Sequence, residues 1–421
     1  MSVTAIRLQN FMGFVDTDWI ELRPVTLLFG KNSTGKSAII RALLLLKQSL
    51  DSPAVAGPLI FKHKDGVDLG SFHRMVRGRI DTEPGDELPR YMTFGFRCRA
   101  EPEHLDKVFG APLSAEEREH LSFVELHLSY YWNPEEKRVE FSSLSAEVRA
   151  NLESEERQTL LEIVVVDQAT EWYDARSFFL SADELPPSLV RLKFERGFIP
   201  GISLDPAGTA SDELSQQKNA LQSIVHRAAD EVRDFFSNLH YLGPMRSRPQ
   251  RYYFPESVLG GWQSQEGMDV ILDFLNHDDE RTEALLSYWM KRLGLGERIS
   301  KREIPLDLTD TEVGYEVQVE KEGETPLSSL REVGYGASQV LPVVLKALFA
   351  PPGALVIVEQ PEVHLHPAMQ VELIDLFIRQ ATASGGVGDS IRFLLETHSE
   401  HMILRALKRI RHTTFAPRIF E

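Results

Sequence analysis

Residues 25–46 read "VTLLFGKNSTGKSAIIRALLLL", and this stretch decides which kind of fold to expect. An apolar run of strand length comes first, followed by a loop that fits the pattern G-x-x-x-x-G-K-[ST]. An apolar run long enough for a buried helix comes next. Strand, glycine-rich loop and helix in this order form a P-loop, in which backbone N–H groups surround phosphate groups. We therefore expect an α/β fold that binds a nucleotide.

The chemistry of a P-loop predicts what individual side chains do. We expect Lys36 to reach the β- and γ-phosphates of ATP, and the Ser37 hydroxyl to bind Mg²⁺. ATP and Mg²⁺ are therefore the expected cofactors. The residues expected to contact the nucleotide in this stretch are Gly30, Lys31, Asn32, Ser33, Thr34, Gly35, Lys36, Ser37 and Ala38.

Two further apolar runs near the C-terminus lack period-2 alternation, which predicts strands covered on both faces. The first is "ALVIVEQPEVHLHP", with a strand expected at 354–358 and a helix at 367–382. Its strand ends at Glu359, where open α/β sheets place their ligands. The second is "IRFLLETHSEHM", with a strand expected at 391–395 and a helix at 399–411. His398 follows this strand as either a γ-phosphate sensor or a structural residue.

The stretch "REVGYGASQVLPVVLKALF" at 331–349 places two glycines before an apolar helix, which we expect at 338–349. Ser338 is the predicted N-cap of this helix, and Pro342 is predicted in its first turn. A serine-capped helix start can bind a phosphate group, although such a cap is also common without any ligand.

Together these motifs resemble the ABC-type ATPase heads of the SMC, RecF and OLD families. The likeness covers about residues 1–80 and 240–421, and it is closest to stand-alone ATPases, some of which are subunits of anti-phage systems such as Septu. It implies an α/β P-loop NTPase of the ABC/SMC-head type with an inserted mixed α/β region. The expected division is 1–80 for the lobe with the P-loop, 81–240 for the insertion and 241–421 for the second lobe.

The resemblance also implies roles for residues outside the P-loop. "GYGASQ" corresponds to the signature loop, so Gly336 and Ser338 are expected to contact the nucleotide of a second subunit, and His398 corresponds to the switch histidine. Family members with an Asp-Glu pair bind Mg²⁺ through the first residue and orient the attacking water with the second. Here Glu359 is the expected Mg²⁺ ligand, while Gln360 or Glu362 is expected to serve the water, and hydrolysis is expected to be slow.

The resemblance further implies a homodimer, or a higher even oligomer, that closes on two Mg-ATP molecules and controls a separate effector such as a nuclease, or a DNA contact. A role in anti-phage defence follows from the resemblance alone. The alternatives are a nucleotide-sensing module with negligible hydrolysis and a RecF-like ATPase of DNA repair. An OLD-type nuclease domain would follow the switch histidine, and only 23 residues follow His398 here, so we expect any nuclease to be a separate chain.

Composition narrows the choice of partners. The net charge of −17 disfavours a protein that coats nucleic acid with most of its surface, because such binding depends on Lys and Arg. The single cysteine, Cys98, is expected to be a small buried residue.

No apolar run approaches the length of a membrane span and the first residues lack a signal-peptide pattern, so we expect a cytoplasmic protein without a membrane partner. The stretch "YLGPMRSRPQRYY" at 241–253 is either a nucleic-acid contact or an arginine-rich seam inside the fold.

Overall fold

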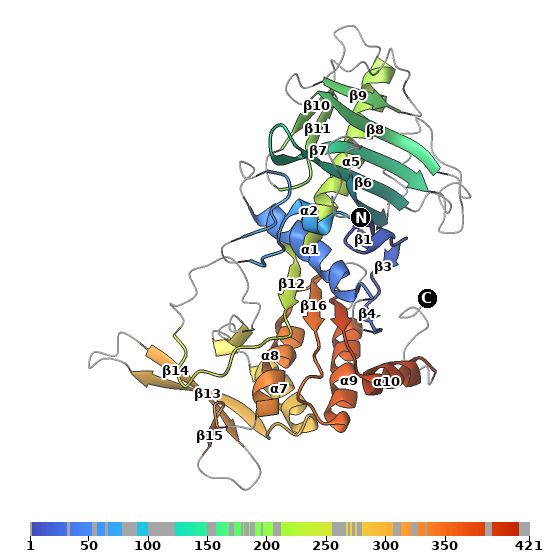
Figure 1. Ribbon diagram of the computed structural model, residues 1–421. Helices are drawn as coiled ribbons and strands as arrows, with labels where there is room; N and C mark the ends of the chain where they lie inside the picture. The colour runs from blue at the N-terminus through green and yellow to red at the C-terminus, as the bar shows by residue number, and fades with distance from the viewer. Residues whose placement is uncertain are drawn as a thin grey trace. The chain divides into compact units, whose positions relative to one another are not determined.

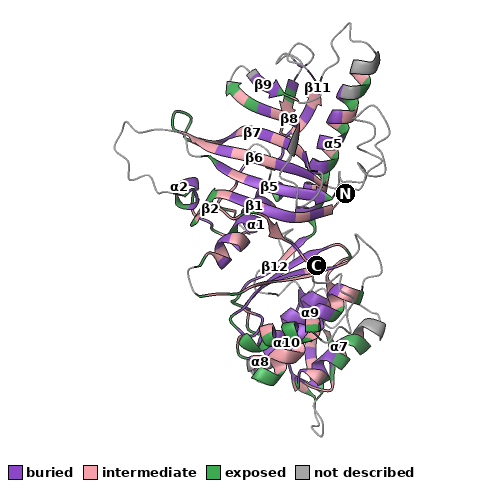
Figure 2. Cartoon of the chain, turned by 90° about the vertical axis from the view of Figure 1, so that its right-hand side faces the viewer, coloured by how far each residue is buried: buried purple, intermediate pink, exposed green. Residues whose placement is uncertain are grey.

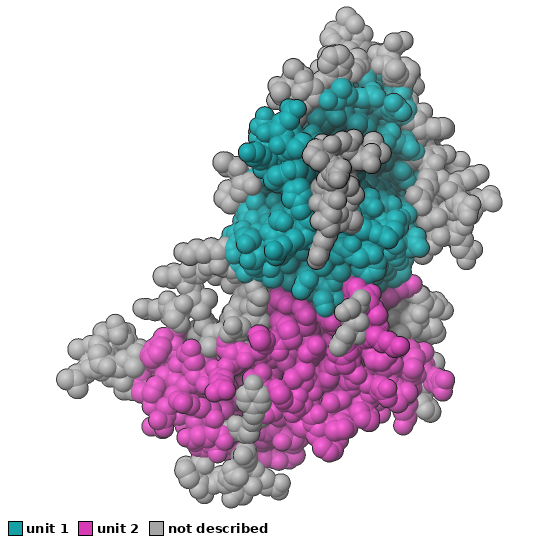
Figure 3. All heavy atoms as spheres, in the orientation of Figure 1, with its two compact units in different colours: residues 1–22, 37–237 teal, residues 23–36, 238–421 magenta. Residues whose placement is uncertain are grey.

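The computed structural model describes residues 2–31, 34–52, 57–63, 66–77, 91–99, 123–149, 157–167, 172–177, 180, 185, 190–194, 197–204, 212–254, 267, 270–271, 274–275, 280–305, 313–320, 327–332, 335–383 and 390–411. The chain divides into two compact units, coloured separately in Figure 3. Unit 1 comprises Met1–Leu22 and Ser37–Ser237, and unit 2 comprises Arg23–Lys36 and Asn238–Glu421. The strand that leads into the P-loop therefore belongs to the same unit as the C-terminal half of the chain.

Unit 1 is built on an antiparallel sheet of eight strands in the order β2-β1-β5-β6-β7-β8-β9, with β3 also paired to β1. The strands are β1 (Ser2–Phe11), β2 (Phe14–Asp16), β3 (Ile20–Glu21), β5 (Met92–Arg99), β6 (Phe123–Asn133), β7 (Arg138–Arg149), β8 (Arg157–Asp167) and β9 (Trp172–Arg176). The residues expected as an insertion thus continue the sheet that begins with the N-terminal strand, because β5 pairs with β1 along most of its length.

Helix α5 (Asp212–Ser237) contacts β1, β5 and β6 of this sheet, and buried residues dominate these strands in Figure 2. Aromatic side chains fill the space between helix and sheet; Phe96, Phe198 and Phe236 lie with ring centroids 5.5–6.1 Å apart. Cys98 is fully buried on β5, as expected, and burial raises the pKa of its thiol to about 12. The thiol therefore stays protonated at neutral pH and acts as a small apolar side chain.

Among the described residues, the rest of unit 1 consists of two helices and a hairpin. Helix α1 (Lys36–Asp51) follows the P-loop, and α2 (Phe72–Met75) is a single turn. The hairpin is formed by β10 (Val190–Lys193) and β11 (Gly201–Leu204), and β11 packs against α5. The apolar run after the P-loop, which predicted a buried helix, forms α1.

Unit 2 contains a parallel sheet in the order β12-β16-β17-β4, three strands of which are labelled in Figure 1. The strands are β12 (Leu239–Leu242), β16 (Leu355–Glu359), β17 (Arg392–Glu396) and β4 (Val25–Leu28). Strands β16 and β17 are buried along nearly their whole length, as the absence of alternation predicted. Because the sheet is parallel, the loops that follow its strands all leave from the same edge.

Four described helices belong to the C-terminal half. They are α7 (Glu280–Arg292), α8 (Tyr335–Phe349), α9 (Pro367–Ala383) and α10 (Glu400–Arg411). Helix α8 contacts β16, and α9 contacts β17 and β4. A small antiparallel sheet, β13 (Arg298–Pro305), β14 (Val313–Glu320) and β15 (Ser328–Ser329), completes the unit. No helix in the described part of the chain is long and apolar enough to cross a membrane.

The start of α8 differs from the prediction. The helix begins at Tyr335, so Ser338 lies inside its first turn and is not the N-cap, and Pro342 lies within the helix beyond the first turn. The reason is a tertiary contact: a Cβ atom added at Gly336 would lie 2.8 Å from the carbonyl oxygen of His364. Gly336 therefore allows the first turn of α8 to approach this backbone closely, and it does not break the helix.

A buried carboxylate connects α9 to α10. Asp375 is 1% exposed and accepts hydrogen bonds from Arg405, at 2.6 Å, and from Arg409. Burial alone would raise the pKa of Asp375, but the hydrogen bonds from the two guanidinium groups outweigh it and lower that pKa. Arg405 and Arg409 of α10 therefore form an internal contact with α9.

Candidate functional site

The P-loop connects β4 to α1, and Lys36 is the first residue of that helix. Lys36 is 8% exposed, and its ammonium group donates hydrogen bonds of 2.9 Å to the carbonyl oxygens of both Gly30 and Lys31. Gly30 and Gly35 have φ angles of 151° and 100°, which favour glycine. The loop thus wraps around the ammonium group that is expected to meet the phosphates. Asn32 and Ser33 lie outside the described residues.

These groups suit the phosphates of a nucleotide. An added Cβ at Gly30 would approach Thr34 Oγ1 to 3.3 Å, so the loop is closely packed where backbone N–H groups must reach a ligand. Ser37 and Ala38 follow Lys36 in the first turn of α1, whose N-terminus favours anions. An ammonium group, a hydroxyl and a carboxylate are the groups that bind Mg-ATP, so the chemistry of Lys36, Ser37 and Glu359 fits this ligand.

The carboxyl ends of the parallel strands are aligned at one edge of the sheet. Glu359 on β16 is paired with Glu396 on β17, and Glu396 is paired with Leu28 on β4. Since Leu28 is two residues from Gly30, the P-loop and the Glu359 carboxylate leave the sheet at the same edge. The hydroxyl of Tyr241, on β12, donates a hydrogen bond of 2.6 Å to Glu359 Oε1 and orients this carboxylate.

Gln360, directly after β16, is held in an unusual conformation. Its φ angle is 46°, in the left-handed region that residues other than glycine seldom adopt. Its N–H donates to the carbonyl oxygen of Glu396 at 2.7 Å. Such a conformation persists where surrounding contacts enforce it, and it is common near functional sites.

Glu362 and His398 are brought together by a hydrogen bond. Glu362 is 8% exposed, and its Oε1 accepts the backbone N–H of His398 at 2.7 Å. Its second oxygen, Oε2, is buried and accepts no hydrogen bond from the residues that the structure describes. The His398 imidazole is exposed. The structure thus assembles Glu359, Gln360, Glu362 and His398 at one edge, while Gly336 packs against the backbone of the loop that follows.

Arg246, which lies in the arginine-rich stretch at 241–253, contacts this edge directly. Its Nη2 donates hydrogen bonds to the carbonyl oxygens of Glu359, at 2.9 Å, and of Gln360, at 3.2 Å. The side chain is 6% exposed, and its Nε and Nη1 atoms have no hydrogen-bond partner among the described residues. Burial lowers the pKa of Arg246 to about 10, and attraction to Glu362 partly offsets this effect, so the guanidinium stays charged at neutral pH.

A signal for Arg246 was present in the sequence but could not be interpreted without the pairing of strands. Leu242 of β12 is paired with Val358 of β16, so the residues that follow β12 must lie beside those that follow β16. The arginine residues of the stretch at 241–253 therefore differ in burial. Arg246 is part of the interior, whereas Arg248 and Arg251 are exposed.

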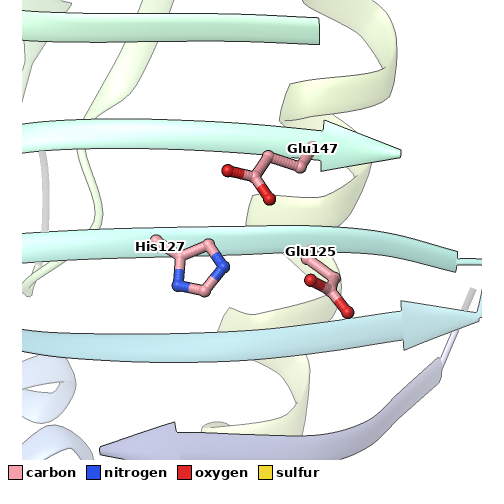
Figure 4. Close-up of side chains that lie close together, drawn as sticks. All are labelled: Glu125, His127 and Glu147. Atoms are coloured by element: carbon pink, nitrogen blue, oxygen red, sulfur yellow. The ribbon is translucent and has the colours of Figure 1, made fainter. Parts of the chain in front are cut away.

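Unit 1 holds a second cluster of polar side chains, shown in Figure 4. Glu125, His127 and Glu147 lie on one face of β6 and β7, with potential ligand atoms within 4.8 Å of one another. Arg97, on β5, donates hydrogen bonds of 2.9 Å to Glu125 and lies 4.3 Å from the centre of the Trp19 ring. We interpret the cluster as an internal ion-pair network of the sheet, because Arg97 supplies positive charge to it.

Residues 25–403 match the family model described as "AAA domain, putative AbiEii toxin, Type IV TA system". The chain belongs to this family. Membership in this AAA family implies use of a nucleotide, typically with Mg²⁺. The expected α/β P-loop NTPase fold is confirmed, while its ABC/SMC-head type stays a prediction. No curated protein matches the chain.

Solved structures of SMC heads are similar to this AAA-family chain. An SMC head bound to the C-winged helix domain of ScpA is 13% identical, with 96% of this chain and 92% of that chain covered and a TM-score of 0.39. The head from Thermotoga maritima is 10% identical, with 96% and 92% covered and a TM-score of 0.38. A head with an extended coiled coil bound to the C-terminal domain of ScpA, derived from Pyrococcus furiosus, is 12% identical, with 96% and 91% covered and a TM-score of 0.37. At these TM-scores we draw no conclusion from the likeness.

The charge of Arg246 should stabilise unit 2 through Glu362. Arg246→Met removes the guanidinium and leaves a buried carboxylate without its nearby positive charge, so we expect a loss of about 3 kcal/mol in the free energy of unfolding. Adding Glu362→Gln should recover part of that loss, because it removes the uncompensated charge. Urea denaturation measures the free energy of unfolding of both variants. Arg248→Met, in the same segment but exposed, is the control and should change stability by less than about 0.5 kcal/mol. Additive effects of the two buried substitutions would contradict the coupling.

Proposed function

We propose that this protein is an ATPase that binds Mg-ATP at the edge of the parallel sheet of unit 2 and hydrolyses it slowly. One observation carries the proposal: the pairing of β16, β17 and β4 brings Glu359 to the edge from which the P-loop departs. Lys36 would neutralise phosphate charge, and Ser37 and Glu359 would hold Mg²⁺. When bound, Mg²⁺ supplies positive charge that stabilises the phosphates during transfer.

Slow hydrolysis is proposed because Gln360 occupies the position of the second carboxylate. The amide of Gln360 can orient a water molecule but cannot take its proton. Glu362 is the nearby carboxylate that can do so; it is two residues further along and fixed by the N–H of His398. Arg246 fixes the backbone between them by binding the carbonyl oxygens of Glu359 and Gln360. We therefore assign the water to Gln360 and Glu362 together.

The protein is further proposed to act as a homodimer, or a higher even oligomer, in which Gly336 and Ser338 of one subunit complete the nucleotide site of the other. Support for this proposal is the signature-like sequence of α8 and its place in unit 2, where Gly336 packs against the backbone of His364. Control of a separate effector, such as a nuclease in anti-phage defence, is proposed from the resemblance of the motifs. The competing proposals are a nucleotide sensor without turnover and an ATPase of DNA repair.

Binding of ATP is the first test. Lys36→Ala removes the ammonium group from the P-loop, and a charge-assisted hydrogen bond to phosphate of about 1.5–3 kcal/mol corresponds to roughly 10- to 100-fold in affinity. Equilibrium binding of a fluorescent ATP analogue measures this loss. Lys62→Ala is a suitable control, because Lys62 is exposed and its substitution removes the same charge. Equal affinity in the parent protein and the Lys36 variant would end the P-loop proposal.

The rate of hydrolysis tests the roles of Gln360 and Glu362. Gln360→Glu keeps the shape of the side chain and adds a general base, so phosphate release should rise by on the order of 10²-fold if the missing base limits the rate. Glu362→Gln should lower the residual rate of the parent protein. Gln250→Glu, at an exposed position, controls for the added charge. If all these proteins release phosphate at one rate, neither Gln360 nor Glu362 acts on the attacking water. If none of them releases phosphate, the result favours a nucleotide sensor without turnover.

Complementation between damaged subunits tests the composite site. Lys36→Ala and Ser338→Arg homodimers should both be inactive, because each contains two damaged sites. A mixed dimer combines both lesions at one site and leaves the other intact, so it should recover up to half of the parent ATPase activity if the sites act independently. Differently tagged subunits, purified through both tags, supply the mixed dimer. Full activity of the Ser338→Arg homodimer would exclude the contact between subunits.

A further inference from the structure

The stretch that follows β12 in unit 2 has a buried side and an exposed side. Arg246 and Tyr253 are buried, whereas Tyr252 and Phe254 are each 40% exposed. Single apolar side chains on a surface are common, but aromatic rings that share a surface with polar groups often mark a binding site. The nucleotide site uses the buried residues of this stretch, so the exposed ones call for a different explanation.

Tyr253 joins this stretch to the small antiparallel sheet of β13 and β14, both labelled in Figure 1. Its backbone N–H donates to the carbonyl oxygen of Tyr315 at 2.8 Å, and the N–H of Tyr315 donates to the carbonyl oxygen of Tyr253 at 2.9 Å. This exchange is the hydrogen-bonded pair of an antiparallel ladder, so the residues on either side of Tyr253 lie along β14. Because successive side chains of a strand point to opposite faces, Tyr252 and Phe254 share one face of the sheet.

The two faces of this sheet differ in burial. The buried face includes Tyr253, Ile299, Val317 and Val319, each at most 1% exposed. On the outer face, the ladder places Tyr252 beside Glu316, which is paired with Arg302 of β13. Phe254 lies beside Gly314, so β14 has no side chain directly opposite its ring. The two aromatic residues therefore lie in neighbouring rows on the outer face of a sheet.

Arginines accompany these two rings. Arg248 and Arg251 are exposed on the same stretch, and Arg302 is exposed on β13. None of the three forms a hydrogen bond or an ion pair with a residue that the structure describes. Arg248 is four residues from Tyr252, at most about 14 Å even in an extended chain, so its guanidinium group belongs to the same surface.

Carboxylates on this face do not cancel the charge of the arginines. Glu316 accepts a hydrogen bond from the amide of Gln318 at 3.1 Å. Glu320, further along β14, is paired with Arg298, which lies 3.8 Å from Glu283. Among the described residues, the rows beside the rings thus combine three arginines with one carboxylate, although the whole chain carries a net charge of −17.

The backbone of this surface is fixed by contacts on its buried side. The hydroxyl of Tyr253 accepts the backbone N–H of Gln250 at 3.1 Å, and Arg246 donates to the carbonyl oxygens of Glu359 and Gln360. A surface that is already ordered loses less conformational entropy when it binds a ligand. The exposed rings and arginines are therefore presented from a rigid support.

Rings and guanidinium groups together match one class of ligand. Two residues along a strand span about 6.6 Å, so Tyr252 and Phe254 can each stack on one of two neighbouring bases. Guanidinium groups bind phosphate oxygens through paired hydrogen bonds. A duplex keeps the faces of its bases inside the stack, whereas a single strand can present them to aromatic rings.

We propose that the outer face formed by residues 248–254 and β13–β14 binds single-stranded nucleic acid without regard to base sequence. Tyr252 and Phe254 stack on bases, and the exposed arginines contact phosphates. This proposal is independent of the ATPase proposal, because it uses none of the groups assigned to Mg-ATP. The same residue types also occur at protein interfaces, so association between copies of this chain is the alternative that the experiment must separate.

Binding of a fluorescein-labelled single-stranded oligothymidine to the full chain, followed by anisotropy without ATP, tests the proposal. The face variants are Tyr252→Ala, Phe254→Ala, Tyr252→Phe and a double variant with Arg248→Ala and Arg251→Ala. The matched controls are Tyr91→Ala and Arg227→Ala in unit 1, because Tyr91 is also 40% exposed and Arg227 is exposed. Lys36→Ala controls for phosphate binding by the P-loop.

Loss of either ring should weaken binding about tenfold, equivalent to about 1.4 kcal/mol, since stacking on an aromatic side chain contributes on this scale. Tyr252→Phe keeps the ring and should bind nearly as the parent does. The double arginine variant should reduce the slope of log affinity against log salt by about 1.4, because each phosphate contact on a single strand contributes about 0.7. Tyr91→Ala, Arg227→Ala and Lys36→Ala should leave the affinity nearly unchanged.

Four results would overturn the proposal. They are no binding by the parent, equal affinity in the face and control variants, equal competition by an unlabelled duplex, and loss of binding in Lys36→Ala alone. The last result would place the oligonucleotide in the P-loop and leave the ATPase proposal intact. Sedimentation of the same proteins covers the alternative: a change of oligomeric state in Tyr252→Ala without a change in oligonucleotide affinity would assign this face to contacts between copies.

Discussion

The parallel pairing of β4 with β17 is the constraint on which the nucleotide site depends. It joins residues 25–28 to residues 393–396 and so connects the P-loop to the C-terminal half of the chain. Once this pair forms, the register with β16 fixes Glu359 at the edge from which the loop leaves. A long-range backbone contact, and not proximity in sequence, therefore assembles the groups that can hold Mg-ATP.

Strand β12 and the residues that follow it also contact the edge of the sheet and hold its groups in place. Tyr241 orients the Glu359 carboxylate, and Arg246 binds the carbonyl oxygens of Glu359 and Gln360. These contacts explain how Gln360 keeps a left-handed backbone, which few side chains other than glycine adopt without support. A buried guanidinium near Glu362 adds positive charge beside the carboxylates and carbonyl groups of this edge. The loop after β16 is thus held in one conformation by groups distant in sequence.

Local pattern was enough to predict the elements around the site, because glycines and apolar runs act over short distances. The expected strand at 354–358 and helices at 367–382 and 399–411 lie within one residue of β16, α9 and α10. Contacts between distant segments could not be predicted in this way. Gly336, in the first turn of α8, lies close to the backbone of His364, and β5 pairs with β1, the N-terminal strand. Arg246 needed the pairing of β12 with β16 to acquire a role.

The order of β4 and β17 along the chain has a consequence for synthesis. Strand β4 lies at the edge of its sheet, and its hydrogen-bonding partner, β17, is the last strand along the part of the chain that the structure describes. At about 5–20 residues per second, roughly 20–70 s pass between the two strands on the ribosome. During that time the β4 backbone has no partner in its sheet, while the segments of unit 1 that follow it can already pair with one another. A chain that stops before residue 392 therefore carries the P-loop sequence without the strand that pairs with β4, so nucleotide binding becomes possible only after residues 393–396 have been made.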